Sequence, residues 1–330
     1  MTLLSVVIVN YRSGELLKAC LEALFRRIGS SSFEVLVVNN DRPADLSSVQ
    51  VLDKPGMRII QNASNVGFGA AANIAFRESK GEFLLLLNPD VVVRPGAVEL
   101  LLETMQARPE MGIALPQLRN PDDTLQYSCR RFYTWKTLWR RRGPWRRRLA
   151  SHPTVRQHLM QDWDHASLAE VDWGLGAAML VRKQALPGAQ LFDERFFLYF
   201  EDVDLCLRLH RAGWKVVYNP AAVMTHQHRR DSAQAGSSLA KLHHLRSLMK
   251  FLWKYRFRLS SPAHIPKLTT DPRARWISVS QFILARSAGA GADPTVLFGA
   301  HPARTQIGNR APNPHLMPET PVPSGTAPRR

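Results

Sequence analysis

The first hundred residues alternate short, continuously apolar segments with segments of helical spacing, and this alternation limits the chain to few folds. The apolar segments are 5–9, 33–38, 57–61 and 83–87. Helical spacing of apolar residues appears between or after them, in 15–27, 70–78 and 96–106. Continuous apolar strands that alternate with helices are typical of a parallel sheet built from βαβ units. We therefore predict an α/β fold.

Polar residues follow three of these predicted strands directly. They are Asn10 and Tyr11 after the first strand, Asn39, Asn40 and Asp41 after the second, and Asn88 and Asp90 after the fourth. An open α/β sheet binds its ligands outside the carboxyl ends of its strands. The sequence thus predicts that these side chains share one ligand-binding edge.

The remainder of the chain is less regular. Strands are predicted at 113–118, 177–181 and 215–218, and a helix at 203–212. We expect one domain over 1–258, with two halves, 1–112 and 113–258. Residues 259–330 are predicted to form an extension. Its last thirty residues hold seven prolines and no apolar periodicity, so disorder is expected from about residue 300.

The net charge of +17 narrows the class of partner. Such an excess of basic over acidic residues favours a polyanionic partner, such as a nucleic acid, an anionic membrane surface or a phosphorylated substrate. The widely spaced Cys20, Cys129 and Cys206 form no metal-ligand or disulfide pattern, which fits a reducing compartment. No signal peptide and no apolar run of about 20 residues is evident. A cytoplasmic protein, soluble or attached to a membrane surface, is expected.

Basic and aromatic residues are interleaved in two segments, 130–148 and 248–257. The first holds nine Lys or Arg, no acid and five aromatic residues. Three interpretations remain open from the residues alone, namely a solvated charged face, a nucleic-acid surface or an interfacial membrane segment.

Acidic residues in two places are candidates for chemistry. Asp90 follows a buried strand and suits a hard divalent cation, although Asn-Pro-Asp is also a good turn sequence. Glu201, Asp202 and Asp204 follow an aromatic run and open a predicted helix. The helix dipole favours acids there, so these residues are either purely structural or include a general base.

Two further side chains have open interpretations. His226 follows a late strand and is either a metal ligand or an ordinary histidine, and the same holds for His228. Tyr11 either stacks on a nucleobase or is a plain loop residue.

Taken together and in order, these residues resemble glycosyltransferase family 2 of the GT-A type, and within it the rhamnosyltransferase-like branch of bacterial surface polysaccharide synthesis. The segments that carry the resemblance are 5–11, 65–73, 86–90, 171–173, 176–177 and 192–205. The resemblance runs from about residue 4 to about residue 255. It implies a GT-A, Rossmann-like nucleotide-diphospho-sugar transferase with a mixed, mainly parallel central sheet. In such a domain, 1–112 would be the nucleotide-sugar-binding half, and 113–258 would be the acceptor and catalytic half, which includes segment 130–148.

The resemblance also implies residue roles. Asp202 would be the catalytic base, with Glu201 beside it. Asp90 and His226 would meet a divalent metal, Mg²⁺ or Mn²⁺. The donor-binding residues would be Asn10, Tyr11, Asn39, Asn40, Asn65, Gly67, Asn88 and Asp90.

This sequence departs from the family pattern at some of these positions. Asn39 stands where the family usually has an acid that bonds the nucleobase, and an amide can both donate and accept. Asn88 replaces the first acid of the Asp-x-Asp motif, which leaves fewer charges for a metal. Basic residues follow His226 where small ones are common in the family.

The activity expected from the resemblance is inverting transfer of a sugar, with rhamnose as the best guess. The donor would be a nucleotide-diphosphate sugar such as dTDP-rhamnose, and the acceptor a lipid-linked or polysaccharide glycan at the inner face of a bacterial cell membrane. Transfer of another hexose by the same fold is the nearest alternative. A basic nucleic-acid-binding protein and a non-catalytic sugar-binding protein are alternatives of other classes, and we expect no nucleic-acid partner.

Overall fold

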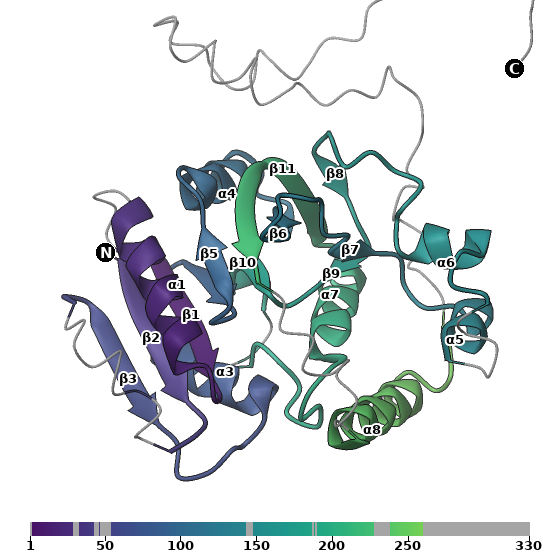
Figure 1. Ribbon diagram of the computed structural model, residues 1–330, viewed down its shortest axis with the longest axis horizontal. Helices are drawn as coiled ribbons and strands as arrows, with labels where there is room; N and C mark the ends of the chain where they lie inside the picture. Colours follow the sequence, from purple (N-terminus) through teal and green to yellow (C-terminus); the bar gives the residue numbers. More distant parts are fainter. Residues whose placement is uncertain are drawn as a thin grey trace, which may run out of the picture. The chain divides into compact units, whose positions relative to one another are not determined.

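One mixed β-sheet organises the part of the chain that the structure describes (Figure 1). The computed structural model describes residues 2–28, 33–42, 46, 54–142, 148–186, 188, 190–227 and 238–259. All of them belong to a single compact unit, Met1–Phe282. The predicted extension 259–330 lies outside the described residues, except for its first residue.

The first part of the chain has the predicted βαβ order. Its strands are β1 (Leu4–Asn10), β2 (Phe33–Asn39), β3 (Met57–Gln61), β4 (Phe83–Leu87) and β5 (Val91–Val93). The helices that accompany them are α1 (Gly14–Arg27), α3 (Phe68–Glu78) and α4 (Ala97–Ala107). Strands β3, β2, β1 and β4 are parallel neighbours in that order.

The strand order reverses at β1, which pairs with β2 on one side and β4 on the other. The crevice beyond the carboxyl ends of strands at such a switch point is where α/β sheets bind ligands. Asn10 and Asn39 are register partners at the ends of β1 and β2, and Asn88 directly follows β4. The backbone therefore places these three residues at one edge of the sheet, as predicted.

The second half extends the sheet with strands of both directions. They are β6 (Met111–Arg119), β8 (Ala169–Glu170), β10 (Ala178–Arg182) and β11 (Lys215–His226), and a separate ribbon joins β7 (Cys129–Arg130) to β9 (Trp173–Gly174). Strand β10 runs antiparallel between β4 and β6, while β6 and β11 are parallel. The antiparallel pairing of β11 with β5 places His226 opposite Val91, next to Asp90.

The two faces of the sheet bury separate hydrophobic clusters. Alternate residues of β1 point to opposite faces, so Val7 packs in one cluster while Val6 and Ile8 pack in the other. Helices α1 and α4 cover one face, and α3 and α7 (Glu201–Arg211) cover the other. This three-layer arrangement is the expected GT-A architecture.

Three helices lie beyond this layered region. They are α5 (Trp135–Arg142), α6 (Pro153–His158) and α8 (Ser238–Lys254), and a short 3-10 turn, η2, spans Lys183–Ala185. Figure 1 shows α5 and α6 together at one end of the sheet and α8 below α7. Among the described residues, no helix is both long and apolar enough to cross a membrane.

Candidate functional site

The ends of β1 and β2 are joined by a buried amide network. The Nδ2 of Asn10 donates to Oδ1 of Asn39 at 2.9 Å, and Nδ2 of Asn39 donates to Oε1 of Gln61 at 2.8 Å. Both asparagine side chains are fully buried. In this structure they therefore form the floor of the ligand edge, while Tyr11, 42% exposed, lies on its surface.

A second amide network holds the loop that leads into α3. Asn65 Oδ1 accepts from the Gly67 amide at 2.9 Å and from Asn40 Nδ2 at 3.2 Å, and Asn40 Nδ2 also donates to the Gly67 carbonyl at 3.1 Å. Asn62 Nδ2 donates to Asn40 Oδ1 at 2.7 Å. The predicted donor-side residues Asn40, Asn65 and Gly67 thus form one cluster.

Gly67 connects this cluster to the loop before α7. Its backbone has φ +90°, and the following amide, of Phe68, donates to the Phe197 carbonyl at 2.9 Å. A Cβ at Gly67 would lie 2.7 Å from that carbonyl oxygen. We predict that Gly67→Ala lowers the free energy of unfolding by about 3 kcal/mol, measured by chemical denaturation, because backbone strain and a clash add together.

Gly96 provides the matched control for that substitution. It has φ +74°, but no atom lies within 4 Å of an added Cβ. Gly96→Ala should therefore lower the free energy of unfolding by only about 1 kcal/mol, because it adds the strain of a left-handed backbone without a clash. Equal losses at the two glycines would contradict the close contact between Gly67 and the Phe197 loop.

Asp90 and His226 meet across the β5–β11 pairing. His226 Nε2 lies 3.4 Å from Asp90 Oδ1, and both side chains are largely buried. His226 Nδ1 lies 2.7 Å from Gln126 Oε1, an acceptor, so the proton belongs on Nδ1. That tautomer directs the Nε2 lone pair to the side of the carboxylate, as metal-binding histidines require.

The Asp90–His226 pair fits a divalent cation as an incomplete ligand set. Adjacent ligands of an octahedral ion with bonds of about 2.1 Å lie about 3 Å apart, close to the separation of these two atoms. Among the described residues, no group of three or more His, Cys, Asp or Glu side chains could hold a metal. The remaining ligands would have to come from a phosphate group and water.

Asp202 lies in the first turn of α7, immediately after two residues with left-handed backbone, Tyr199 and Phe200. Its Oδ1 accepts from the Val203 amide at 2.8 Å, and its Oδ2 accepts from the Gly176 amide at 3.2 Å. Burial raises the pKa of Asp202 to about 6, against the opposing effect of these two amides. The carboxyl group is therefore held in place and is ionised at neutral pH.

The neighbouring acids differ from Asp202 in environment. Glu201 is buried, and its Oε2 has no hydrogen-bond partner among the described residues. Burial, followed by the charge of Asp202, raises the pKa of Glu201 well above its usual value. Asp204 is fully buried and binds Arg208, Lys254 and Tyr255, so it joins α7 to α8. Asp204 is thus the structural acid of the group.

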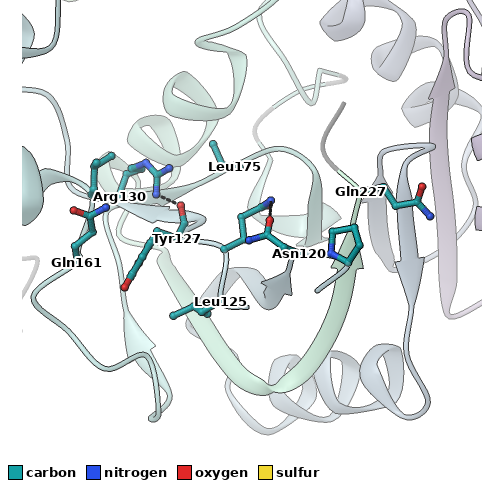
Figure 2. A pocket seen from close by; sticks show the side chains of 10 residues that line it. Asn120, Leu125, Tyr127, Arg130, Gln161, Leu175 and Gln227 are labelled. Carbon is teal, nitrogen blue, oxygen red and sulfur yellow. Dashed lines mark hydrogen bonds between the residues drawn. The ribbon is translucent and has the colours of Figure 1, made fainter. Parts of the chain in front are cut away.

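A cavity of about 380 Å³ lies beside both acidic centres. Figure 2 shows the side chains that line it, which are Asn120, Pro121, Leu125, Gln126, Tyr127, Arg130, Leu159, Gln161, Leu175 and Gln227. Gln126 is the partner of His226, and the Gln227 amide donates to the Asp90 carbonyl at 2.9 Å. Leu175 directly precedes Gly176, whose amide binds Asp202. The cavity therefore extends from the neighbours of one centre to those of the other.

Arg130 contributes the positive charge of this cavity. Its guanidinium donates to the carbonyls of Cys129, at 2.8 Å, and Tyr127 (Figure 2). Burial and the charge of Arg141 lower the pKa of Arg130 to about 10, so it stays cationic at neutral pH. Its charge also lowers the pKa of Asp202. The cavity therefore suits a polar ligand that carries a negative charge.

The structure brings together most of the candidates that the sequence suggested, in two clusters. The donor-side amides form one cluster, and Asp90 with His226 forms the other. The acids Glu201 and Asp202 lie together in the first turn of α7, and His228 lies outside the described residues. Sequence reasoning missed Arg130, Gln126 and the amide of Gly176. Gly176 had a visible signal, because it stands between a short apolar segment and the next strand.

Comparisons with known proteins place the chain in a family and show a similar fold. The sequence model described as "Glycosyltransferase like family 2" matches residues 2–241. The chain is 29% identical to the N-acetylglucosaminyl-diphospho-decaprenol L-rhamnosyltransferase of Mycobacterium tuberculosis, over 73% of this chain and 81% of that protein. It is 27% identical to the rhamnosyltransferase WbbL of Escherichia coli, over 60% of this chain and 77% of that protein.

A solved structure with similar architecture is that of the mannosyltransferase PcManGT from Pyrobaculum calidifontis, in complex with GDP-Man and Mn²⁺. The TM-score is 0.54 and the identity 15%, and the match covers 89% of this chain and 77% of that one. At this identity the likeness concerns the fold alone.

Proposed function

This chain belongs to glycosyltransferase family 2, and we propose that it transfers a sugar from a nucleotide-diphosphate donor by a single, inverting displacement. Asp202 is the proposed base, and the cavity beside it is the proposed acceptor site. The observation that carries the proposal is the position of this one cavity, whose lining includes neighbours of both Asp202 and the Asp90–His226 pair.

Asp202 removes the acceptor proton in the proposed reaction. As the acceptor oxygen bonds to the anomeric carbon of the sugar, the bond from that carbon to the diphosphate oxygen breaks, and the acceptor proton moves to the Asp202 carboxylate. The Gly176 and Val203 amides orient the carboxylate. A pKa near 6 keeps it ionised at neutral pH but basic enough to accept a proton.

Asp90 and His226 would hold a divalent cation together with the donor diphosphate. A bound Mg²⁺ or Mn²⁺ supplies electrostatic stabilisation of the negative charge that develops on the departing nucleoside diphosphate. Gln126 fixes the tautomer of His226 in this assignment. Asn88, which directly follows β4, lies two residues before Asp90.

The donor nucleoside would lie over the ends of β1 and β2. Tyr11 offers an exposed ring there. The buried Asn10–Asn39 pair forms the floor of this part of the site. The neighbouring network consists of Asn40, Asn65 and Gly67. The two named relatives are rhamnosyltransferases, and one is named for a diphospho-decaprenol acceptor. These names support rhamnose as the sugar and a lipid-diphosphate-linked glycan as the acceptor. The proposed donor is dTDP-rhamnose, and the proposed place of transfer is the inner membrane face.

A donor panel tests the proposal directly. The full chain is incubated with individual nucleotide sugars and Mg²⁺ or Mn²⁺, and release of nucleoside diphosphate is measured with and without a polyprenyl-diphosphate glycan acceptor. We expect one donor, dTDP-rhamnose, to give acceptor-dependent release well above the others. If a different sugar nucleotide gives the acceptor-dependent release, the proposed transfer activity stands and that sugar takes the place of rhamnose.

The pH dependence of kcat/KM tests the role of Asp202 as the base. Because the pKa of Asp202 in the free protein is about 6 and the base must be ionised, activity should fall below about pH 6. The expected fall is roughly tenfold per pH unit. Near-ultraviolet circular dichroism over the same range would verify that the fold persists.

Arg130→Gln should move this acid limb to higher pH, because the Arg130 charge lowers the pKa of Asp202. Arg131→Gln is the matched control, since Arg131 forms an ion pair with Asp172 at 3.0 Å instead. The acid limb of kcat/KM could remain unchanged in Arg130→Gln, or it could move equally in both variants. Either result would show that a group other than Asp202 controls this limb.

A further inference from the structure

Helix α8 has two faces of different character. Its inner residues, such as Leu248, Phe251 and Leu252, are buried in the core. Its outer residues Leu242, Leu245, Met249 and Trp253 recur at intervals of three or four and are exposed, with Trp253 73% exposed. A continuous apolar stripe on the solvent side of a helix is what a docking surface requires.

The inner face of α8 holds the loop that leads to the proposed base. Ser247 Oγ donates to the Leu198 carbonyl at 2.8 Å, His243 stacks on Phe197 at 4.7 Å, and His244 stacks on Tyr199 at 4.9 Å. Further along α7, Asp204 accepts from Lys254 at 2.5 Å and from Tyr255 at 2.7 Å. Helix α8 is therefore fixed rigidly to the first turn of α7.

Helix α5 extends the outer stripe. Trp135 of α5 stacks on Phe257, just beyond α8, with ring centroids 6.3 Å apart and planes inclined by 10°. Trp139, one turn further along α5, is 60% exposed. We call the exposed side chains of α5 and α8 together with Phe257 the Trp–Leu face.

The two helices of the Trp–Leu face carry cations and no acids of their own. Helices α5 and α8 contain no Asp or Glu, and the exposed cations on or beside them include Lys136, Lys241, Arg246, Lys250, Arg256 and Arg258. A helix with Trp and Leu on one face and Lys or Arg around it is the composition of a segment that lies in a bilayer interface. The charge complements anionic headgroups.

We propose that the Trp–Leu face docks on an anionic bilayer surface, with the indole rings at headgroup level and the aliphatic stripe of α8 at the acyl boundary. Nucleic acid is the other polyanion that the charge would suit. It offers phosphates and bases for cations and aromatic rings but no apolar phase for Leu242, Leu245 and Met249, so the aliphatic stripe favours lipid.

Docking in this way brings the loop that leads to Asp202 close to the membrane. The helix that meets lipid on its outer face holds residues 197–199 on its inner face, so the position of Asp202 relative to the bilayer is set by α8. The relevance of that position to a lipid-linked acceptor rests on the proposed function. Vesicle binding itself requires neither donor nor acceptor.

Vesicle binding by the full chain tests the proposal. We expect co-sedimentation with phosphatidylglycerol–phosphatidylcholine vesicles at low salt, weaker binding at high salt, and much weaker binding to phosphatidylcholine alone. Trp139→Ser combined with Trp253→Ser should weaken binding by about tenfold or more. Lys241→Gln combined with Arg246→Gln should weaken it roughly thirtyfold.

Arg26→Gln combined with Arg27→Gln is the charge-matched control, because these exposed arginines end α1, away from α8 in Figure 1. Equal losses in the two charge variants, equal binding to neutral vesicles, or no binding at all would overturn the proposal. RNA binding lost in the same variants without vesicle binding would assign the face to nucleic acid. Transfer to a water-soluble acceptor should be unchanged in the face variants, and absence of that activity from the wild type would count against the proposed function alone.

Discussion

Asp202→Asn is expected to lower kcat for sugar transfer by a factor of about 10² to 10⁴, the usual contribution of a general base. The asparagine side chain keeps the shape of the carboxylate, and its single oxygen can still accept from one of the two amides that bind Asp202, those of Gly176 and Val203. It cannot take the acceptor proton at neutral pH. Steady-state transfer with the identified donor measures the loss, and calorimetric titration with the nucleoside diphosphate should show that donor-side binding persists.

Asp204→Asn is the matched control from the same turn of α7. Asp204 binds Arg208, Lys254 and Tyr255 in a buried network, so the substitution should cost about 3 kcal/mol of unfolding free energy. Its kcat, measured below the unfolding transition, should change far less than that of Asp202→Asn. Near-wild-type kcat in Asp202→Asn would exclude Asp202 as the base.

Asp90→Asn is expected to lower kcat/KM by about a hundredfold or more, because a metal at the diphosphate supplies several kcal/mol of charge stabilisation. Removal of divalent ions with a chelator should have a similar effect on the wild type, and added Mn²⁺ should restore activity. Binding of Mn²⁺ in the presence of nucleoside diphosphate, followed by electron paramagnetic resonance, gives a readout that is independent of turnover.

Gln126 and Asp164 sharpen this metal test. Gln126→Ala removes the partner of His226 Nδ1 and should weaken Mn²⁺ affinity by about 10- to 100-fold. Asp164→Asn removes an exposed acid that bonds the Ala166 amide at 3.0 Å, and it should leave Mn²⁺ binding unchanged. Unaltered Mn²⁺ affinity in Asp90→Asn would show that the metal, if used, binds elsewhere.

The central sheet was predictable from sequence because its strands carry continuous apolar runs. The segments 33–38, 57–61 and 83–87 match β2, β3 and β4 within one residue, and the polar residues at the strand ends share one edge as expected. Chain direction was not predictable in the same way. The apolar pattern of β10 resembles that of a parallel strand, yet β10 is antiparallel to both of its neighbours.

The basic-aromatic segments show what a linear pattern leaves out. Phe132 and Tyr133 are buried in the core, whereas Trp135 and Trp139 are exposed, so one run of aromatics divides between interior and surface. Composition did not reveal that Phe132 and Tyr133 lie in the segment before α5, whereas Trp135 and Trp139 lie in α5 itself. The charge of Arg130 was likewise assigned to a surface segment, although it lies within reach of Asp202.

Long-range partners were also absent from the sequence signal. The bond between His226 and Gln126 joins residues 100 positions apart, and that between Gly176 and Asp202 spans 26 positions. Each depends on the register of β11 with its neighbours or on the placement of α7. The roles of these residues as a metal anchor and an orienting amide remain predictions.

The anomeric configuration of the product tests the single displacement by Asp202 most directly. The purified full chain, its donor and an acceptor are incubated to completion, and the configuration of the new glycosidic bond is determined by nuclear magnetic resonance. A direct attack by the acceptor hydroxyl predicts a product whose anomeric configuration is opposite to that of the donor sugar. A product that retains the donor configuration would contradict the account.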